Sequence, residues 1–150
     1  MQITDSTQTP ISRLERNWAM AMHLSAFAGA VGLPFGHVLG PLIVYLLRGH
    51  ESEFIGEHGR ASLNYQITLS ILGIVAVIVA AAVTLGFVET GTAGNAAQTA
   101  YGIGVATVWL ALAIAAGVVV LLSVVFIIIG TVKASEGLPY NYPFAIRFLR

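Results

Sequence analysis

The chain has 150 residues, of which 57% are hydrophobic and only 9% are charged, and its formal net charge is zero. Soluble domains average about 45–50% apolar and about 25% charged residues, so this composition is typical of an integral membrane protein. The charge balance gives no indication of a nucleic-acid partner. The absence of cysteine excludes disulfides, thiolate metal sites and cysteine nucleophiles.

The N-terminal residues 1–13 are polar and rich in Thr, Ser and Gln, which predicts a flexible tail. A cleaved signal peptide is the alternative, because Arg13 and Arg16 precede an apolar run that reaches a small-x-small pattern at 26–28. The basic residues come late and His23 interrupts the run, so we favour an uncleaved chain. Trp18, at the start of this run, suits the headgroup level of a bilayer.

Residues 18–47 would form a helix of about 45 Å, which is too long for a simple crossing. Pro34 lacks an N–H group and disfavours a helical conformation at the preceding residue, and Gly32 and Gly36 flank it. We therefore predict two short helices, 18–31 and 36–47, joined by a hairpin at Pro34. Each is shorter than a full crossing, so a tilted or re-entrant hairpin is expected.

Two long apolar segments, 63–88 and 101–132, each exceed the roughly 20 residues that a helix needs to cross a bilayer. The loop between them, 89–100, has no Lys or Arg, so we expect it to face away from the cytoplasm. With the hairpin, every basic residue lies on the opposite side. We predict an all-α integral membrane protein, a four-helix bundle with both termini cytoplasmic. Residues 14–150 form its single membrane domain.

Polar side chains at the start of the third segment are spaced to form two stripes. Asn64 and Thr68 are four residues apart, as are Gln66 and Ser70. Such groups are costly against lipid and stabilising between helices, so they are candidates for helix packing or for a polar path. In the last segment Ala113 and Gly117 form a small-xxx-small pair, a candidate packing surface for a neighbouring helix or a second copy.

The C-terminal tail, 138–150, is predicted to lie at the membrane interface, after Gly137 and Pro139 end the last helix. Aromatic residues with flanking arginines suit the cytoplasmic interface and anionic headgroups. The alternative is that the tail packs over its own bundle, and both can hold. The candidate interface residues are Trp18, Tyr140, Tyr142, Arg147 and Arg150.

Histidine chemistry has two interpretations here. His23 lies inside a predicted helix. It could form a metal or proton site together with His37, but we favour a neutral side chain that forms a hydrogen bond to a neighbouring helix. Residues 48–62 are predicted to form a short surface helix, and their His and Glu side chains are interpreted as a solvated face. No catalytic or nucleotide-binding motif occurs. We therefore predict no enzyme activity, no metal and no cofactor.

An ordered series of motifs runs through the chain: Arg16-Asn-Trp-Ala-Met-Ala-Met-His-Leu-Ser-Ala, Leu33-Pro-Phe-Gly, Gly40-Pro-Leu-Ile, Glu57-His-Gly-Arg, Leu63-Asn-Tyr-Gln-Ile, Lys133-Ala-Ser-Glu-Gly and Tyr142-Pro-Phe-Ala-Ile-Arg-Phe. Together these motifs resemble one family of small bacterial membrane proteins of unknown function, which is grouped with the Tic-type channel subunit of the chloroplast inner-envelope translocon. The resemblance covers roughly 14–150 and implies a four-helix membrane domain without catalytic residues, located in the bacterial inner membrane.

Two functions follow as expectations. The first is an interaction, scaffold or accessory subunit of a membrane assembly, with the bilayer and either a membrane-protein partner or a second copy of itself as partners. The alternative is a channel or protein-translocation component, which rests on the Tic-type resemblance and the polar stripes.

Overall fold

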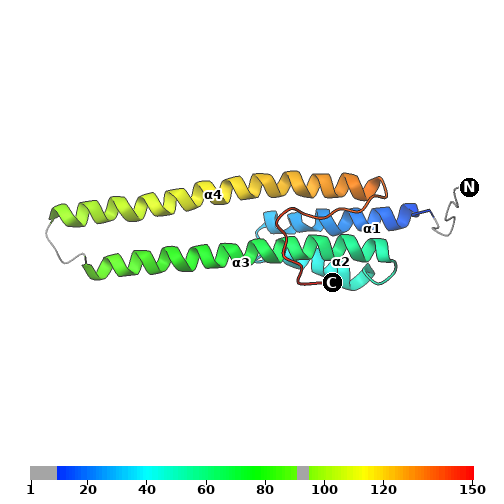
Figure 1. Ribbon diagram of the computed structural model, residues 1–150, viewed down its shortest axis with the longest axis horizontal. Helices are drawn as coiled ribbons and strands as arrows, with labels where there is room; N and C mark the ends of the chain where they lie inside the picture. Colours follow the sequence, from blue (N-terminus) through cyan, green and yellow to red (C-terminus); the bar gives the residue numbers. More distant parts are fainter. Residues whose placement is uncertain (1–9, 91–94) are drawn as a thin grey trace, which may run out of the picture. The chain divides into compact units, whose positions relative to one another are not determined.

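The computed structural model describes residues 10–90 and 95–150 (Figure 1). Most of the predicted tail and residues 91–94 of the predicted loop therefore lie outside the described residues. In the described part every regular element is helical, which confirms the all-α class with two long apolar helices. The elements are α1 (Arg13–Leu24), the 3-10 helix η1 (Ser25–Val31), α2 (Gly36–Arg48), α3 (Glu53–Thr90) and α4 (Asn95–Ser135).

The described residues divide into two compact units, and the single membrane domain expected from the sequence stays a prediction. Among the described residues, unit 1 consists of 10–67 and 125–150, and unit 2 consists of 68–90 and 95–124. The long helices α3 and α4 each contribute to both units. Unit 1 therefore contains the N-terminal hairpin and the C-terminal tail, whereas the described residues of unit 2 belong to the two long apolar segments.

α1 begins at Arg13, five residues earlier than predicted, because a capping box fixes its first turn. The Ser12 hydroxyl accepts a hydrogen bond from the Glu15 backbone N–H at 3.2 Å, and the Glu15 carboxylate accepts one from the Ser12 N–H at 2.8 Å. This reciprocal pair satisfies backbone donors that a helix start otherwise leaves open. Helix initiation is thus set by two polar residues and not by the apolar run that follows.

The N-terminal hairpin turns at the predicted position, around Pro34. Its backbone adopts the left-handed conformation at Gly32, where φ is 82°, and at Phe35, where φ is 55°. α2 then packs tightly on η1, since a Cβ added at Gly36 would lie 2.6 Å from the Ala28 carbonyl oxygen and one at Gly40 would collide with the Ser25 carbonyl. The predicted helix 18–31 is in fact α1 followed by η1.

α3 joins two segments that the sequence suggested were separate. The predicted surface helix and the predicted segment 63–88 form one continuous helix from Glu53. The Ser52 hydroxyl accepts a hydrogen bond from the Ile55 N–H at 3.3 Å at its start, and an ion pair joins Arg60 to Glu53 along its first two turns. At about 1.5 Å per residue the helix is about 56 Å long, well beyond a single bilayer core.

Unit 2 consists of residues 68–90 of α3 and residues 95–124 of α4. Thr84 joins them: its carbonyl accepts from the Tyr101 hydroxyl at 2.9 Å, and its hydroxyl accepts from the Trp109 indole N–H at 3.2 Å. Two helical stretches, Glu53–Gly86 and Thr99–Ser135, are long and apolar enough to cross a membrane, and only 11% and 6% of their most apolar windows are buried.

Candidate functional site

A buried hydrogen-bonded chain of three side chains lies at the centre of unit 1. His23, in the last turn of α1, is completely buried. Its Nδ1 lies 2.8 Å from the Tyr142 hydroxyl, and its Nε2 lies 2.7 Å from Nδ1 of His58 on α3. His23 therefore ties α1 both to α3 and to the C-terminal tail, which are 35 and 119 residues away in sequence.

Aromatic rings enclose this chain. Tyr142 stacks on Tyr65 of α3 with ring centroids 4.4 Å apart, and Phe54 meets the His58 ring edge-on at 4.6 Å. Gly130 of α4 leaves the room that the site needs, because a Cβ there would lie 2.9 Å from the Tyr140 ring and 3.1 Å from the His23 ring. Side chains from all these elements thus keep water away from the imidazoles.

Electrostatics favour the neutral forms in this cluster. Burial, and secondarily the neighbouring His58 ring, lower the pKa of His23 to about 3. Burial also raises the pKa of the Tyr142 hydroxyl far above its ordinary value. Desolvation penalises whichever form carries charge, which is why the imidazole pKa falls and the phenol pKa rises. At neutral pH the cluster is therefore uncharged.

Two arrangements of the protons are compatible with both hydrogen bonds among the three neutral side chains. Either Tyr142 donates to His23, which donates to His58, or both donations run in the opposite direction. In the described residues His58 Nε2 and Ser62 Oγ are buried without a hydrogen-bond partner of normal geometry. The arrangement can hold a proton or pass one between its members, but each member is at most 5% exposed. Its direct effect is to join three elements of unit 1.

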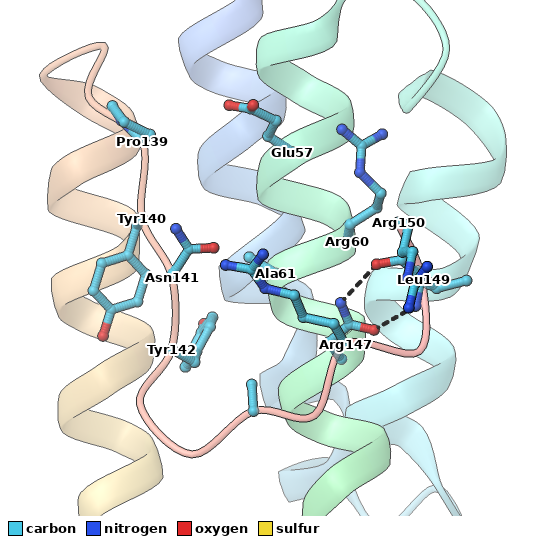
Figure 2. A pocket seen from close by; sticks show the side chains of 12 residues that line it. Glu57, Arg60, Ala61, Pro139, Tyr140, Asn141, Tyr142, Arg147, Leu149 and Arg150 are labelled. Carbon is cyan, nitrogen blue, oxygen red and sulfur yellow. Dashed lines mark hydrogen bonds between the residues drawn. The ribbon is translucent and has the colours of Figure 1, made fainter.

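A cleft of about 750 Å³ lies beside this cluster, between the first turns of α3 and the C-terminal tail (Figure 2). Asn64 of α3 holds the tail there: its Oδ1 accepts from the backbone N–H groups of Phe148 and Leu149 at 3.0 and 2.8 Å, and its Nδ2 donates to the Leu149 carbonyl at 3.0 Å. The charged residues that line the cleft are Glu57, Arg60, Arg147 and Arg150.

Unit 1 brings together most of the residues that the sequence singled out. Asn64, Tyr140, Tyr142, Arg147 and Arg150 all line the cleft, and Tyr142 connects it to His23. The tail therefore packs on its own helices, which was the alternative placement for it. Any contact of these residues with lipid remains a prediction.

The other candidate residues lie elsewhere. Trp18 stacks under the Arg48 guanidinium, 4.8 Å from its ring centroid, and so links α1 to α2. Gln66 and Thr68 are buried and Ser70 is partly buried on α3. Ala113 and Gly117 are exposed on α4 in unit 2, where a Cβ at Gly117 would meet nothing within 4 Å. Gly117 is therefore not a close-packing position within the described residues.

Sequence reasoning missed His58, which it assigned to a solvated face. The residues Phe54, His58, Ser62 and Tyr65 follow helical spacing and share one face of α3. That pattern is visible in the sequence only once the helix is extended back to Glu53. Across residues 10–90 and 95–150 no group of three or more His, Cys, Asp or Glu side chains is arranged to hold a metal ion.

Comparison with known proteins matches the chain to a protein family. The model of a family described as "magnetosome magnetite crystal formation protein family" matches residues 14–149, which is nearly the whole chain. No curated protein and no solved structure matches. The comparisons provide no support for the Tic-type resemblance, so the translocation alternative stays a prediction.

Proposed function

The chain belongs to the magnetosome magnetite crystal formation protein family, and we propose that it serves that process as an accessory membrane subunit and not as an enzyme. The family match over residues 14–149 is the observation that carries the proposal. Unit 2 supports the membrane part of it, because its exposed surface is apolar over lengths that suit a bilayer crossing.

The arrangement of unit 1 supports an accessory role. Its buried ionisable side chains, His23, His58 and Tyr142, bond to one another and are closed off from solvent. Groups that act on a substrate need to reach it, whereas these hold α1, α3 and the tail together. We propose that unit 1 is a rigid head that presents a fixed surface to a partner of the assembly or to a second copy.

The proposed topology places both termini on the cytoplasmic side of the magnetosome membrane. Unit 2 crosses the bilayer twice, and the hairpin tip dips into it. Val31, Leu33 and Phe35 at that tip are 75%, 58% and 58% exposed, and lipid is a favourable environment for such side chains. The turn is too short to cross, so it enters and leaves on one side.

Deletion of the gene tests the proposed role in a host that forms magnetite. We expect fewer or smaller magnetite crystals, with recovery when the wild-type chain is restored. Unchanged crystal number and size would contradict a role in crystal formation. Crosslinking in native membranes tests the scaffold part separately: a bound membrane protein or a second copy is expected, and a strictly monomeric chain would contradict it.

A further inference from the structure

The cleft between α3 and the C-terminal tail carries an excess of positive charge. Three arginines and one glutamate line it, and Figure 2 shows that Arg60 comes from α3 whereas Arg147 and Arg150 come from the tail. Arg60 is already paired with Glu53. Within the described part of the chain, Arg147 and Arg150 make no hydrogen bond or ion pair, so two guanidinium groups remain for a ligand.

The tail is held in place before any ligand binds. The three hydrogen bonds of Asn64 fix the backbone at Phe148 and Leu149, between the two free arginines. Asn64 itself is only 5% exposed, so these bonds are shielded from water. A ligand therefore does not need to order this backbone, which lowers the entropic cost of binding.

The dimensions and chemistry of the cleft suit a small anion group. Its volume of about 750 Å³ lies in the range of about 300–1,000 Å³ that is common for small-ligand sites. A guanidinium group presents donors in a planar fork that matches phosphate oxygens, and two such groups can balance a phosphate's charge. Tyr140 and Asn141 add a phenol and an amide to the lining.

Apolar side chains of the tail are exposed next to the arginines. Phe144, with φ at 62°, is 92% exposed, and Ile146 and Phe148 are 55% and 45% exposed. This combination suits a lipid at the membrane interface. The acyl chain of such a lipid can contact the exposed apolar side chains, and its anionic headgroup can enter the cationic cleft.

We propose that the cleft binds a phosphate group through Arg147 and Arg150, presented either by an anionic lipid headgroup or by free phosphate. The proposal goes beyond the function proposed above and does not depend on it. Arg60 contributes positive potential from the α3 side, and Asn64 acts as the positioning residue that keeps the tail over the helix.

The test uses the full chain purified in a non-ionic detergent, with two probes. Inorganic phosphate is titrated and followed by line broadening in its ³¹P NMR signal. Phosphatidylglycerol is titrated and retained lipid is counted by native mass spectrometry, with phosphatidylcholine as the reference lipid. The variant R147Q/R150Q removes the two free guanidinium groups. The control R13Q/K133Q removes two positive charges from the start of α1 and the end of α4 in the same unit.

We expect saturable binding of at least one probe, weakened about tenfold or more in R147Q/R150Q and by less than about twofold in the control. If R147Q/R150Q loses affinity for inorganic phosphate, the cleft is a free-phosphate site. If it loses affinity for phosphatidylglycerol alone, the cleft is a headgroup site. R147K/R150K, which keeps the charge without the planar fork, should give intermediate affinity. No saturable binding of either probe, or an equal loss in the control, would overturn the proposal. Equal circular dichroism spectra of all variants establish that they are folded.

Discussion

The two units of this protein differ in how closely their glycines are packed. In unit 1 several helical glycines are close-packing positions: a Cβ at Gly36 or Gly40 would collide with the backbone of η1, and one at Gly130 would press on His23 and Tyr140. In unit 2, a Cβ at Gly73 or Gly117 would meet nothing within 4 Å. Tight packing thus explains glycines in one unit and does not explain them in the other.

The same contrast holds for the larger side chains. Unit 1 buries polar groups such as His23, His58 and Asn64 with partners, while unit 2 exposes apolar ones such as Ile78, Ile114 and Leu121, each more than 60%. The order of unit 1 therefore comes from its own side-chain contacts. The exposed apolar surface of unit 2 suits the proposed bilayer crossing.

A charge in the middle of α4 gives the largest expected effect. Ile114→Arg puts a guanidinium at the centre of the apolar segment, which costs about 3 kcal/mol of membrane insertion. Leu14→Arg is the matched control, because Leu14 is equally exposed, at 61%, but lies in unit 1. Carbonate extraction of membranes measures the integrated fraction. If the integrated fraction fell equally in both variants, or in neither, the proposed difference between the units would be contradicted.

Removal of the central histidine tests whether unit 1 holds itself together. His23→Ala leaves Tyr142 and His58 without partners and creates a cavity, so we expect a loss of about 3 kcal/mol in the free energy of unfolding. Trp18 fluorescence, in a Trp109→Phe background, follows unit 1 during titration with sodium dodecyl sulfate. His50→Ala is the control at an exposed histidine and should change the free energy of unfolding by less than about 0.5 kcal/mol. A similar small change for His23→Ala would contradict the role of the cluster.

Adding one methyl group distinguishes the two kinds of glycine. Gly40→Ala forces α2 away from η1, for which we expect a loss of about 2 kcal/mol in the free energy of unfolding. Gly73→Ala meets open space and should be neutral or stabilising by about 0.5–1 kcal/mol, since alanine is the better helix former. The same detergent titration, followed by Trp18 and by Trp109, compares them. Equal destabilisation would mean that unit 2 packs as tightly as unit 1.

Acidification should weaken unit 1 through His23. Its pKa is about 3 in the folded state and about 6.5 when unfolded, so between these values only the unfolded chain takes up the proton. Stability therefore falls as pH decreases from 6.5, by about 1.4 kcal/mol for each pH unit. Unfolding followed by Trp18 fluorescence at pH 7.5 and pH 5.5 measures this loss of stability. The difference between the two pH values should be smaller in His23→Ala. Constant or rising stability on acidification would contradict the buried neutral state.

Release of the tail is the smallest expected effect. Asn64→Ala removes three hydrogen bonds to the tail. We expect a net cost of about 1 kcal/mol in the free energy of unfolding, because the released tail can move out of its shielded position and turn its backbone groups to water. Faster amide hydrogen exchange at Phe148 and Leu149 reports it locally. Asn17→Ala on the exposed side of α1 is the control. Unchanged exchange at these two amides would show that the clamp does not hold the tail.

The sequence predicted the features that depend on local physics. Chain length and apolar runs indicated the two long helices, and Pro34 between two glycines indicated the hairpin. The start of α1 was missed because a short polar capping box and not an apolar residue begins it. The start of α3 was missed because charged residues obscure the helical spacing of its first ten positions.

The site was only partly predictable, because it depends on contacts between distant parts of the chain. His23 and Asn64 were singled out as polar groups in apolar surroundings, and the tail as aromatic and cationic. Nothing local pairs His23 with Tyr142, 119 residues later, or Asn64 with Leu149, 85 residues later. The partner His58 stayed hidden because its helix face was assigned to solvent.

Single-cysteine labelling tests most directly whether unit 2 lies in lipid while unit 1 lies on one side of it. The natural chain has no cysteine, so each introduced thiol reports alone. A membrane-impermeant maleimide should label Leu14→Cys and Phe144→Cys from the cytoplasmic side only, and it should leave Ile114→Cys unlabelled from either side. Labelling of positions 14 and 144 from opposite sides, or free labelling at position 114, would contradict this account.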